Sequence, residues 1–249
     1  MTSVPQPHAG SSEAGKRTRV APGRFPRVVS VREMEEIDQA AIHTLGIPRL
    51  LLMEHAGLAV ARAARVLLEN PQQAQDLVVC CGLGYNGGDG FCAAWHLAQW
   101  GYRPSLVLLG ALHQLKEEPA TYARILQALQ IPMRAVTSLD ELAPLQTWVS
   151  RCRLIIDALL GLGLTGPVRP LYAKVIELIN QAHKPVVCVD VPSGLNADTG
   201  LPQGCAVKAT VTVTFGLPKQ GFFLEEGPAY VGDLVIDDIG MPPTLLAMR

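Results

Sequence analysis

The chain has 249 residues, of which 49% are hydrophobic and 17% charged, and its formal net charge is −1. A chain of this length and composition can bury a sizeable core, and its balanced charge gives no sign of a nucleic-acid partner. No apolar run approaches the ~18 residues of a membrane helix, and the N-terminus lacks the apolar core of a secretion signal, so a cytoplasmic protein is expected.

The cysteines and histidines show no pattern of a disulfide framework or a metal site. The six cysteines include no C-x-x-C pair, and the six histidines include no H-E-x-x-H motif. An even cysteine count in a chain this long, without a secretion signal, does not imply disulfides. The sequence therefore predicts free cysteines and argues against a zinc site.

Residues 1–27 are rich in Pro, Gly, Ser and Arg and contain one acidic residue, Glu13. An Arg-rich, acid-poor start is also typical of organelle transit peptides. Prolines and glycines interrupt any amphipathic helix there, so we favour a disordered leader and leave organelle targeting open. One domain is expected to fill residues 28–249.

Two helices are predicted ahead of any strand. Residues 30–33 form a capping box, apolar residues then recur at spacings of three and four, and Gly46 ends the helix. Pro48 opens a second helix, whose apolar side carries many small residues. Such residues permit close packing on a sheet or on a partner subunit, and we expect a homodimer formed through residues 30–68.

From Leu77 onward, apolar strand-like runs alternate with helical patterns. Strands are predicted at 77–81, 105–109, 131–136, 154–158, 185–190, 209–215 and 230–239, and helices at 91–100, 120–129, 138–149 and 171–182. This alternation is typical of an α/β domain whose mostly parallel sheet is covered by helices on both faces. Ligands of such sheets bind outside the carboxyl ends of the strands.

A glycine-rich turn, Gly82–Gly90, follows the first predicted strand and contains the spacing G-x-G-x-x-G. The glycines could bring the backbone close to a phosphate, or they could simply make a tight turn between strand and helix. The second strand ends without the acid that binds a ribose hydroxyl, which disfavours an ordinary NAD-dependent dehydrogenase. Asn86 and Asp89 add polar groups that a phosphate loop does not need, although Asp89 could instead cap the helix.

Two predicted strands end in a carboxylate, at Asp157 and at Asp190. Either could be a plain turn residue, because Asp favours turns. Asn86, Asp157 and Ser193 together would offer only oxygen ligands and one negative charge, which fits a hard, monovalent cation.

Five ordered motifs resemble the NAD(P)H-hydrate epimerase family, also called the YjeF N-terminal domain: Met53–Gly57, Gly82–Gly90, Asp157–Leu164, Asp190–Leu195 and Thr214–Lys219. The resemblance implies a three-layer α-β-α Rossmann-like sandwich that is commonly dimeric. It also implies an isomerase that interconverts the R and S epimers of hydrated NADH and NADPH (NADHX and NADPHX). A separate ATP- or ADP-dependent dehydratase would repair the S form. The preference between NADHX and NADPHX stays open.

The same resemblance implies roles for particular residues. One potassium ion per subunit would be held by Asn86, Asp157 and Ser193. The implied substrate contacts are Tyr85, Asn86, Gly87, Gly88, Asp89, Gly161, Leu162, Gly163, Leu164, Thr165, Gly166, Pro167 and Asp190. The family usually has an asparagine where this chain has Tyr85, a departure that bears on a substrate contact or on the rate.

Epimerisation of the hydrate requires a hydroxyl beside the ring nitrogen to leave and to return on the other face. A carboxyl group can donate the proton to the departing oxygen and stabilise the cation that forms. Asp190 is our first candidate for this catalytic group and Asp89 the second. Lys219 is a possible helper, although a lysine is usually exposed and solvated.

Two other functions stay open. One is a binding or scaffold module on the same fold, and the other is a methyltransferase or dehydrogenase that uses the glycine-rich turn. The missing ribose acid weakens the latter. Retention of Asn86, Asp157, Asp190 and Ser193 favours the enzyme over a scaffold, which has no physical need of them.

Overall fold

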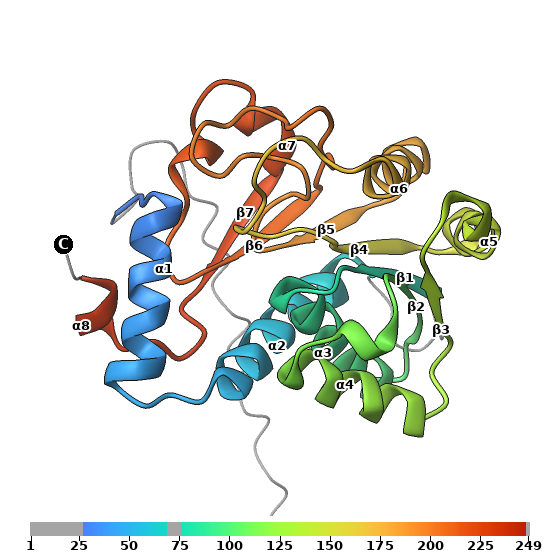
Figure 1. The fold of residues 1–249 in the computed structure, drawn as a ribbon, viewed down its shortest axis with the longest axis horizontal. Helices are drawn as coiled ribbons and strands as arrows, with labels where there is room; N and C mark the ends of the chain where they lie inside the picture. The colour runs from blue at the N-terminus through green and yellow to red at the C-terminus, as the bar shows by residue number, and fades with distance from the viewer. Residues whose placement is uncertain (1–26, 69–75, 248–249) are drawn as a thin grey trace, which may run out of the picture.

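The computed structural model describes residues 27–68 and 76–247. The predicted disordered leader, apart from its last residue, lies outside the described residues. Within them, seven strands form one sheet in the order β3-β2-β1-β4-β5-β6-β7 (Figure 1). The strands are β1 Asp76–Cys81, β2 Arg103–Leu109, β3 Met133–Val136, β4 Leu154–Ala158, β5 Val186–Val189, β6 Val211–Phe215 and β7 Asp233–Asp237.

Every neighbouring pair in this sheet is parallel, which confirms the predicted α/β class. The chain moves outward from β1 through β2 to β3, and then returns to the other side of β1 to add β4. The carboxyl ends of β1 and β4 are therefore adjacent, with Cys81 paired to Ala158. A reversal of strand order of this kind leaves a crevice in which doubly wound proteins bind their ligands.

Helices cover both faces of the sheet, so the predicted three-layer sandwich is confirmed (Figure 1). One face carries α2 Arg49–Leu67, α3 Tyr85–Gln99 and α4 Glu117–Ala128, and the other carries α5 Ala143–Arg151 and α6 Pro170–Gln181. The remaining helical elements are α1 Val31–Gln39, η1 Ala40–Thr44, η2 Leu112–Gln114, η3 Leu139–Glu141, η4 Gln220–Phe222, α7 Gly227–Val231 and α8 Pro243–Leu246. Within the described ranges, helices long and apolar enough for a membrane span are absent.

The predicted capping box at the start of α1 is confirmed. The backbone nitrogen of Glu33 donates to Ser30 Oγ over 3.2 Å, and the backbone nitrogen of Ser30 donates to Glu33 Oε2 over 2.8 Å. These two bonds satisfy amides that the first turn of a helix leaves free. The predicted free cysteines are also confirmed, since all six lie in described residues and none is bridged.

The predicted start of the third helix, at residue 91, is wrong, because α3 already begins at Tyr85. Its glycines serve close packing inside the helix. A Cβ on Gly90 would lie 2.5 Å from Ala158 Cβ in β4, and one on Gly88 would lie 2.6 Å from Met53 Cε in α2. Most of the glycine-rich turn is therefore the part of α3 that presses against the sheet and against α2.

The small residues of α2 pack within the chain. A Cβ on Gly57 would lie 2.4 Å from Cys92 Cβ of α3, and buried alanines of α2 belong to the core between these helices and the sheet. Of the two interpretations left open by the sequence, packing within one chain therefore accounts for these residues. The last predicted strand is shorter than expected, because residues 227–231 form α7.

A candidate active site with three carboxylates

A cavity of about 1250 Å³ opens at the carboxyl ends of the strands, at the reversal of strand order. Its walls come from α1, from the starts of α2 and α3, and from residues 159–165 after β4. Asp190 and Lys219 line it from the other side. The parallel topology thus brings sequence-distant polar side chains to one place.

Asp190 follows β5 directly and has a φ of 62°, a left-handed conformation that costs energy for a residue with a side chain. Its Oδ1 accepts hydrogen bonds from Lys219 Nζ (2.6 Å), Thr214 Oγ1 (3.1 Å) and Phe215 N (3.2 Å). Among the described residues, Oδ2 has no such donor, and Asp190 lines the cavity. The surrounding strands therefore hold a strained carboxylate with one oxygen available to a ligand.

Lys219, the possible helper named from the sequence, is fully buried, unlike most lysines. Besides Asp190, its ammonium donates to Thr214 Oγ1 over 2.8 Å and to the Phe215 carbonyl over 2.9 Å. A buried ammonium is costly unless it is paired and hydrogen-bonded, and three acceptors meet that need here. The bond from Lys219 also fixes the direction of the Asp190 carboxylate.

Asp89 reaches the cavity from the second turn of α3. It does not cap the helix, because the N-cap is Gly84 and no side chain caps it. Burial raises the pKa of the Asp89 carboxyl well above its ordinary value, and the negative charges of Asp190 and Asp38 raise it further. The surroundings of Asp89 therefore favour its protonated form.

Asp38, on α1, also lines the cavity, and it is not among the site residues predicted from the sequence. Burial and the charge of Asp190 raise the pKa of Asp38 to about 6, while the charges of Lys219 and Arg49 oppose this shift. The sequence gives one weak indication of this position. Asp38 follows Met34 by about one helical turn, so it lies on the buried side of α1.

Asp38→Asn is expected to stabilise the protein at pH 7.5. Because the folded-state pKa of Asp38 is raised, its charging penalty is absent below about 3.8 and fully present above about 6. At about 1.4 kcal/mol per pKa unit, this penalty is at most about 3 kcal/mol. Thermal unfolding at pH 7.5 and at pH 3.5 would measure it: the variant should melt a few degrees higher at the first pH and equally at the second. Glu36→Gln, an exposed change on α1, should shift neither transition.

Asp157 and Ser193 form a fully buried pair beneath the cavity. Ser193 donates to Asp157 Oδ1 through its hydroxyl (2.6 Å) and to Oδ2 through its backbone nitrogen (2.9 Å). Burial raises the pKa of Asp157, and the hydrogen bonds from Ser193 and Cys188 partly offset this. Asn86 lies against Gly161, because a Cβ added to Gly161 would lie 3.2 Å from the Cβ of Asn86. The Nδ2 atom of Asn86 is buried and has no hydrogen-bond partner among the described residues.

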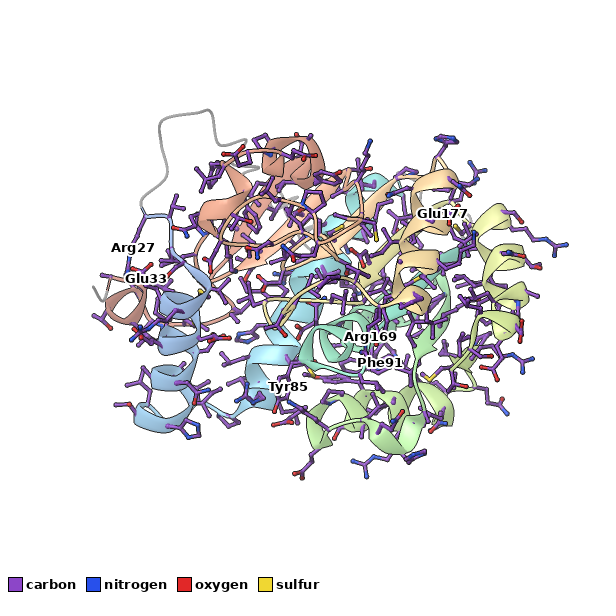
Figure 2. The ribbon with its side chains drawn as sticks, turned by 45° about the horizontal axis from the view of Figure 1, so that its top comes forward. Arg27, Glu33, Tyr85, Phe91, Arg169 and Glu177 are labelled. Atoms are coloured by element: carbon purple, nitrogen blue, oxygen red, sulfur yellow. The ribbon has the colours of Figure 1, made fainter. Side chains whose placement is uncertain are left out.

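The implied substrate contacts divide into two groups. The first group lines the cavity and consists of Tyr85, Asn86, Asp89, Asp190 and most of residues 161–167. The second group does not: Gly87 and Gly88 are buried in the packing of α3, and Gly166 is not part of the cavity wall. The ring of Tyr85 lies under two cations, Arg49 and Lys116 (Figure 2 labels Tyr85).

A second polar cluster lies where α2, α3 and α4 meet. Glu54 accepts from His96 Nε2 (2.8 Å) and from the Tyr122 hydroxyl (2.6 Å), and the Cys92 thiol lies 3.4 Å from the same carboxylate. Although the sequence argued against a zinc site, Glu54, Cys92 and His96 do come within reach of one ion. Because these donors already bond one another, we attribute the cluster to the locking of three helices together.

The fold and this cavity define a doubly wound α/β protein with a ligand site at the point where its strand order reverses. A family model described as YjeF-related protein N-terminus matches residues 49–221, and the chain belongs to this family. A protein of Limosilactobacillus fermentum named NAD(P)H-hydrate epimerase is 40% identical over 215 residues, which cover 86% of this chain and 98% of that protein.

Longer relatives match as well. The bifunctional NAD(P)H-hydrate repair enzyme Nnr of Pyrobaculum aerophilum is 43% identical over 201 residues, which cover 80% of this chain but only 39% of that enzyme. The chain thus spans about two fifths of the bifunctional relatives. A crystal structure of the yeast protein YNL200c has the same fold, with a TM-score of 0.75 and 22% identity over 90% of this chain and 94% of that one.

Proposed function

We infer that this protein is an NAD(P)H-hydrate epimerase, an isomerase that interconverts the R and S epimers of hydrated NADH and NADPH. The observation that carries the inference is the match to a relative of that name along 98% of its length. The cavity adds chemical support, because a scaffold module has no need of a strained Asp190 paired with a buried Lys219.

Two features of the cavity suit the reaction. The carbon that inverts carries a hydroxyl and neighbours the ring nitrogen, whose lone pair drives departure of the hydroxyl and leaves an iminium-like cation. A protonated carboxyl can give its proton to the departing oxygen, which leaves as water. When water adds to the other face, the proton returns to the carboxylate. A nearby carboxylate stabilises the cation between these two steps.

We assign the proton donor to Asp89 and the stabilising carboxylate to Asp190. The sequence alone favoured Asp190 as the acid–base group. The raised pKa of Asp89 and the 2.6 Å bond between Lys219 and Asp190 support the opposite division of roles. Lys219 then acts as a positioning residue, since its 2.6 Å bond fixes the direction of the Asp190 carboxylate.

The residues of the buried pair fit the proposed potassium ion. Asp157 is a fully buried carboxylate whose hydrogen-bond donors among the described residues are all neutral. A buried charge of this kind is costly without a counter-ion. Asn86, Asp157 and Ser193 would hold the ion, which would supply the missing positive charge beside the cavity.

Potassium is expected to stabilise the protein beyond a general salt effect. An ion at one hundred times its dissociation constant adds about 2.7 kcal/mol, because it binds the folded state alone. The melting temperature in KCl should therefore exceed that in an equal concentration of choline chloride. Asp157→Asn should remove this difference, whereas Asp233→Asn, an exposed change at the start of β7, should keep it. Equal melting temperatures of the wild-type protein in both salts would contradict the potassium site.

The proposed partners follow from the family. A separate dehydratase would act on the S form. Some relatives are longer chains named bifunctional NAD(P)H-hydrate repair enzyme. We also propose a homodimer in the cytoplasm. Its support is the exposed apolar set Leu45, Leu50, Leu51 and Val66 on the segment that the sequence proposed as an interface.

A coupled assay tests the proposed role. Pure R-NADPHX is mixed with an ATP-dependent dehydratase that accepts only the S epimer, and recovery of NADPH is followed by absorbance. Adding this protein should speed complete recovery in proportion to its concentration. Recovery that stays at the spontaneous rate at high protein concentration would favour the scaffold function.

A further inference from the structure

Two cations flank one aromatic ring in the cavity wall. The guanidinium carbon of Arg49, at the start of α2, lies 4.3 Å from the centre of the Tyr85 ring, and Lys116 Nζ, just before α4, lies 4.2 Å from it. All three residues line the cavity. Cation–π contacts of this kind hold flexible basic side chains in place without consuming their hydrogen-bond donors.

The cavity holds both acidic and basic side chains. Three of the acidic ones are Asp38, Asp89 and Asp190, and the charge of Asp190 raises the pKa of both Asp38 and Asp89. Arg49 and Lys116 each lie over the Tyr85 ring, and the Glu118 carboxylate lies 3.8 Å from Arg49 Nε. This ion pair is long, and it leaves the remaining nitrogens of Arg49 able to bind an anion.

The position of these two cations, near the carboxyl end of β2, indicates which part of a nucleotide they would bind. In doubly wound nucleotide-binding proteins, the residue after the second strand selects the 2′ position of the adenosine ribose: an acid accepts a hydroxyl, and a basic residue accepts a 2′-phosphate. Here β2 ends at Leu109, and Gly110 and Ala111 follow without an acid. Lys116 is the first lysine or arginine after this strand, and Arg49 reaches the same point from α2.

We propose that Arg49 and Lys116 bind the 2′-phosphate of NADPHX beside the Tyr85 ring, so that the protein prefers NADPHX to NADHX. This proposal rests on the inferred epimerase function for its substrate. Arginine binds phosphate through paired N–H groups, and lysine adds a compact positive charge, so the two together suit a dianionic group. Arg32 and Arg169 also line the cavity, but the cation–π contacts of Tyr85 among the described residues are those with Arg49 and Lys116.

Binding of two nucleotide fragments tests the subsite without any catalysis. Adenosine 2′,5′-bisphosphate and adenosine 5′-monophosphate differ only in the 2′-phosphate, and calorimetry measures both. We expect the bisphosphate to bind the wild-type protein roughly 10-fold or more tightly, the usual effect of a hydrogen bond to a charged group. Lys116→Gln and Arg49→Gln should each reduce this margin. Equal affinities for the two fragments in the wild-type protein would overturn the proposal.

Kinetics separate the 2′-phosphate from the phosphates that both substrates share. Each variant should lower kcat/KM for NADPHX about 10-fold more than for NADHX. Lys174→Ala, which breaks an exposed pair with Glu177 on α6, is the matched control and should leave both values unchanged (Figure 2 labels Glu177, far from Tyr85). Equal losses for both substrates would overturn the proposal in favour of the shared pyrophosphate. If the wild-type protein binds the bisphosphate more tightly than the monophosphate but has no epimerase activity, that result would support the subsite and contradict the inferred reaction.

Discussion

Asp190→Asn is expected to lower kcat for epimerisation by roughly 10²–10³-fold, the usual loss when one electrostatic contact to a transition state is removed. The carboxylate of Asp190 is held by Lys219 at 2.6 Å and has one oxygen free to face the cationic intermediate. Asparagine keeps the shape of the side chain and removes its charge. Single-turnover measurements with R-NADPHX would give the rate of the chemical step directly.

The variant needs a control for folding, because it leaves the buried ammonium of Lys219 without its counter-ion. Breaking a buried pair in this way costs about 3–5 kcal/mol of stability. Asp190→Asn combined with Lys219→Met removes both charges, so its melting temperature should recover while its activity stays low. Near-wild-type turnover in either folded variant would contradict the role of Asp190.

Asp89→Asn is expected to lower the rate by roughly 10²–10⁴-fold, the usual contribution of a general acid. The folded-state pKa of Asp89 is raised by burial and by Asp190 and Asp38, which favours the protonated form that a general acid needs. As pH rises through that raised pKa, the proton is lost and the rate should fall. The variant should lack this alkaline decline, and a pH profile of kcat/KM would show it.

The two carboxylates are distinguished by which variant changes the pH profile. If Asp89→Asn keeps both its rate and the alkaline decline, while Asp190→Asn loses the decline, then Asp190 is the proton donor that the sequence alone favoured. Asp38→Asn should retain a large part of the wild-type activity, since Asp38 acts on Asp89 through its charge.

The sequence predicted the fold and half of the site for a clear physical reason. Strands that end in a carboxylate place it at the edge where parallel strands bind ligands, so Asp157 and Asp190 could be located from periodicity alone. Periodicity could not predict which of the two carboxylates faces the cavity. Asp157 is fully buried in hydrogen bonds with Ser193, whereas Asp190 lines the cavity, and this difference depends on packing between β4, β5 and their loops.

Other site features depend on contacts that no local pattern records. The burial of Lys219 follows from its reach to Thr214 and Asp190, and Asp38 joins the cavity only because α1 packs beside the sheet edge. The prediction that residues 82–90 form a turn was wrong for most of this segment, for a related reason. Glycines signal a turn in sequence, but Gly88 and Gly90 are needed where α3 approaches Met53 and Ala158 closely.

The most direct measurement is the interconversion of the epimers themselves. Pure R-NADPHX is incubated with the protein and KCl, without ATP and without any redox partner, and the two epimers are quantified by chromatography. We expect the mixture to reach the same R-to-S ratio from pure R and from pure S, at a rate proportional to protein concentration. A ratio that drifts at the spontaneous rate from both sides, with correctly folded protein in large amount, would contradict the epimerase function.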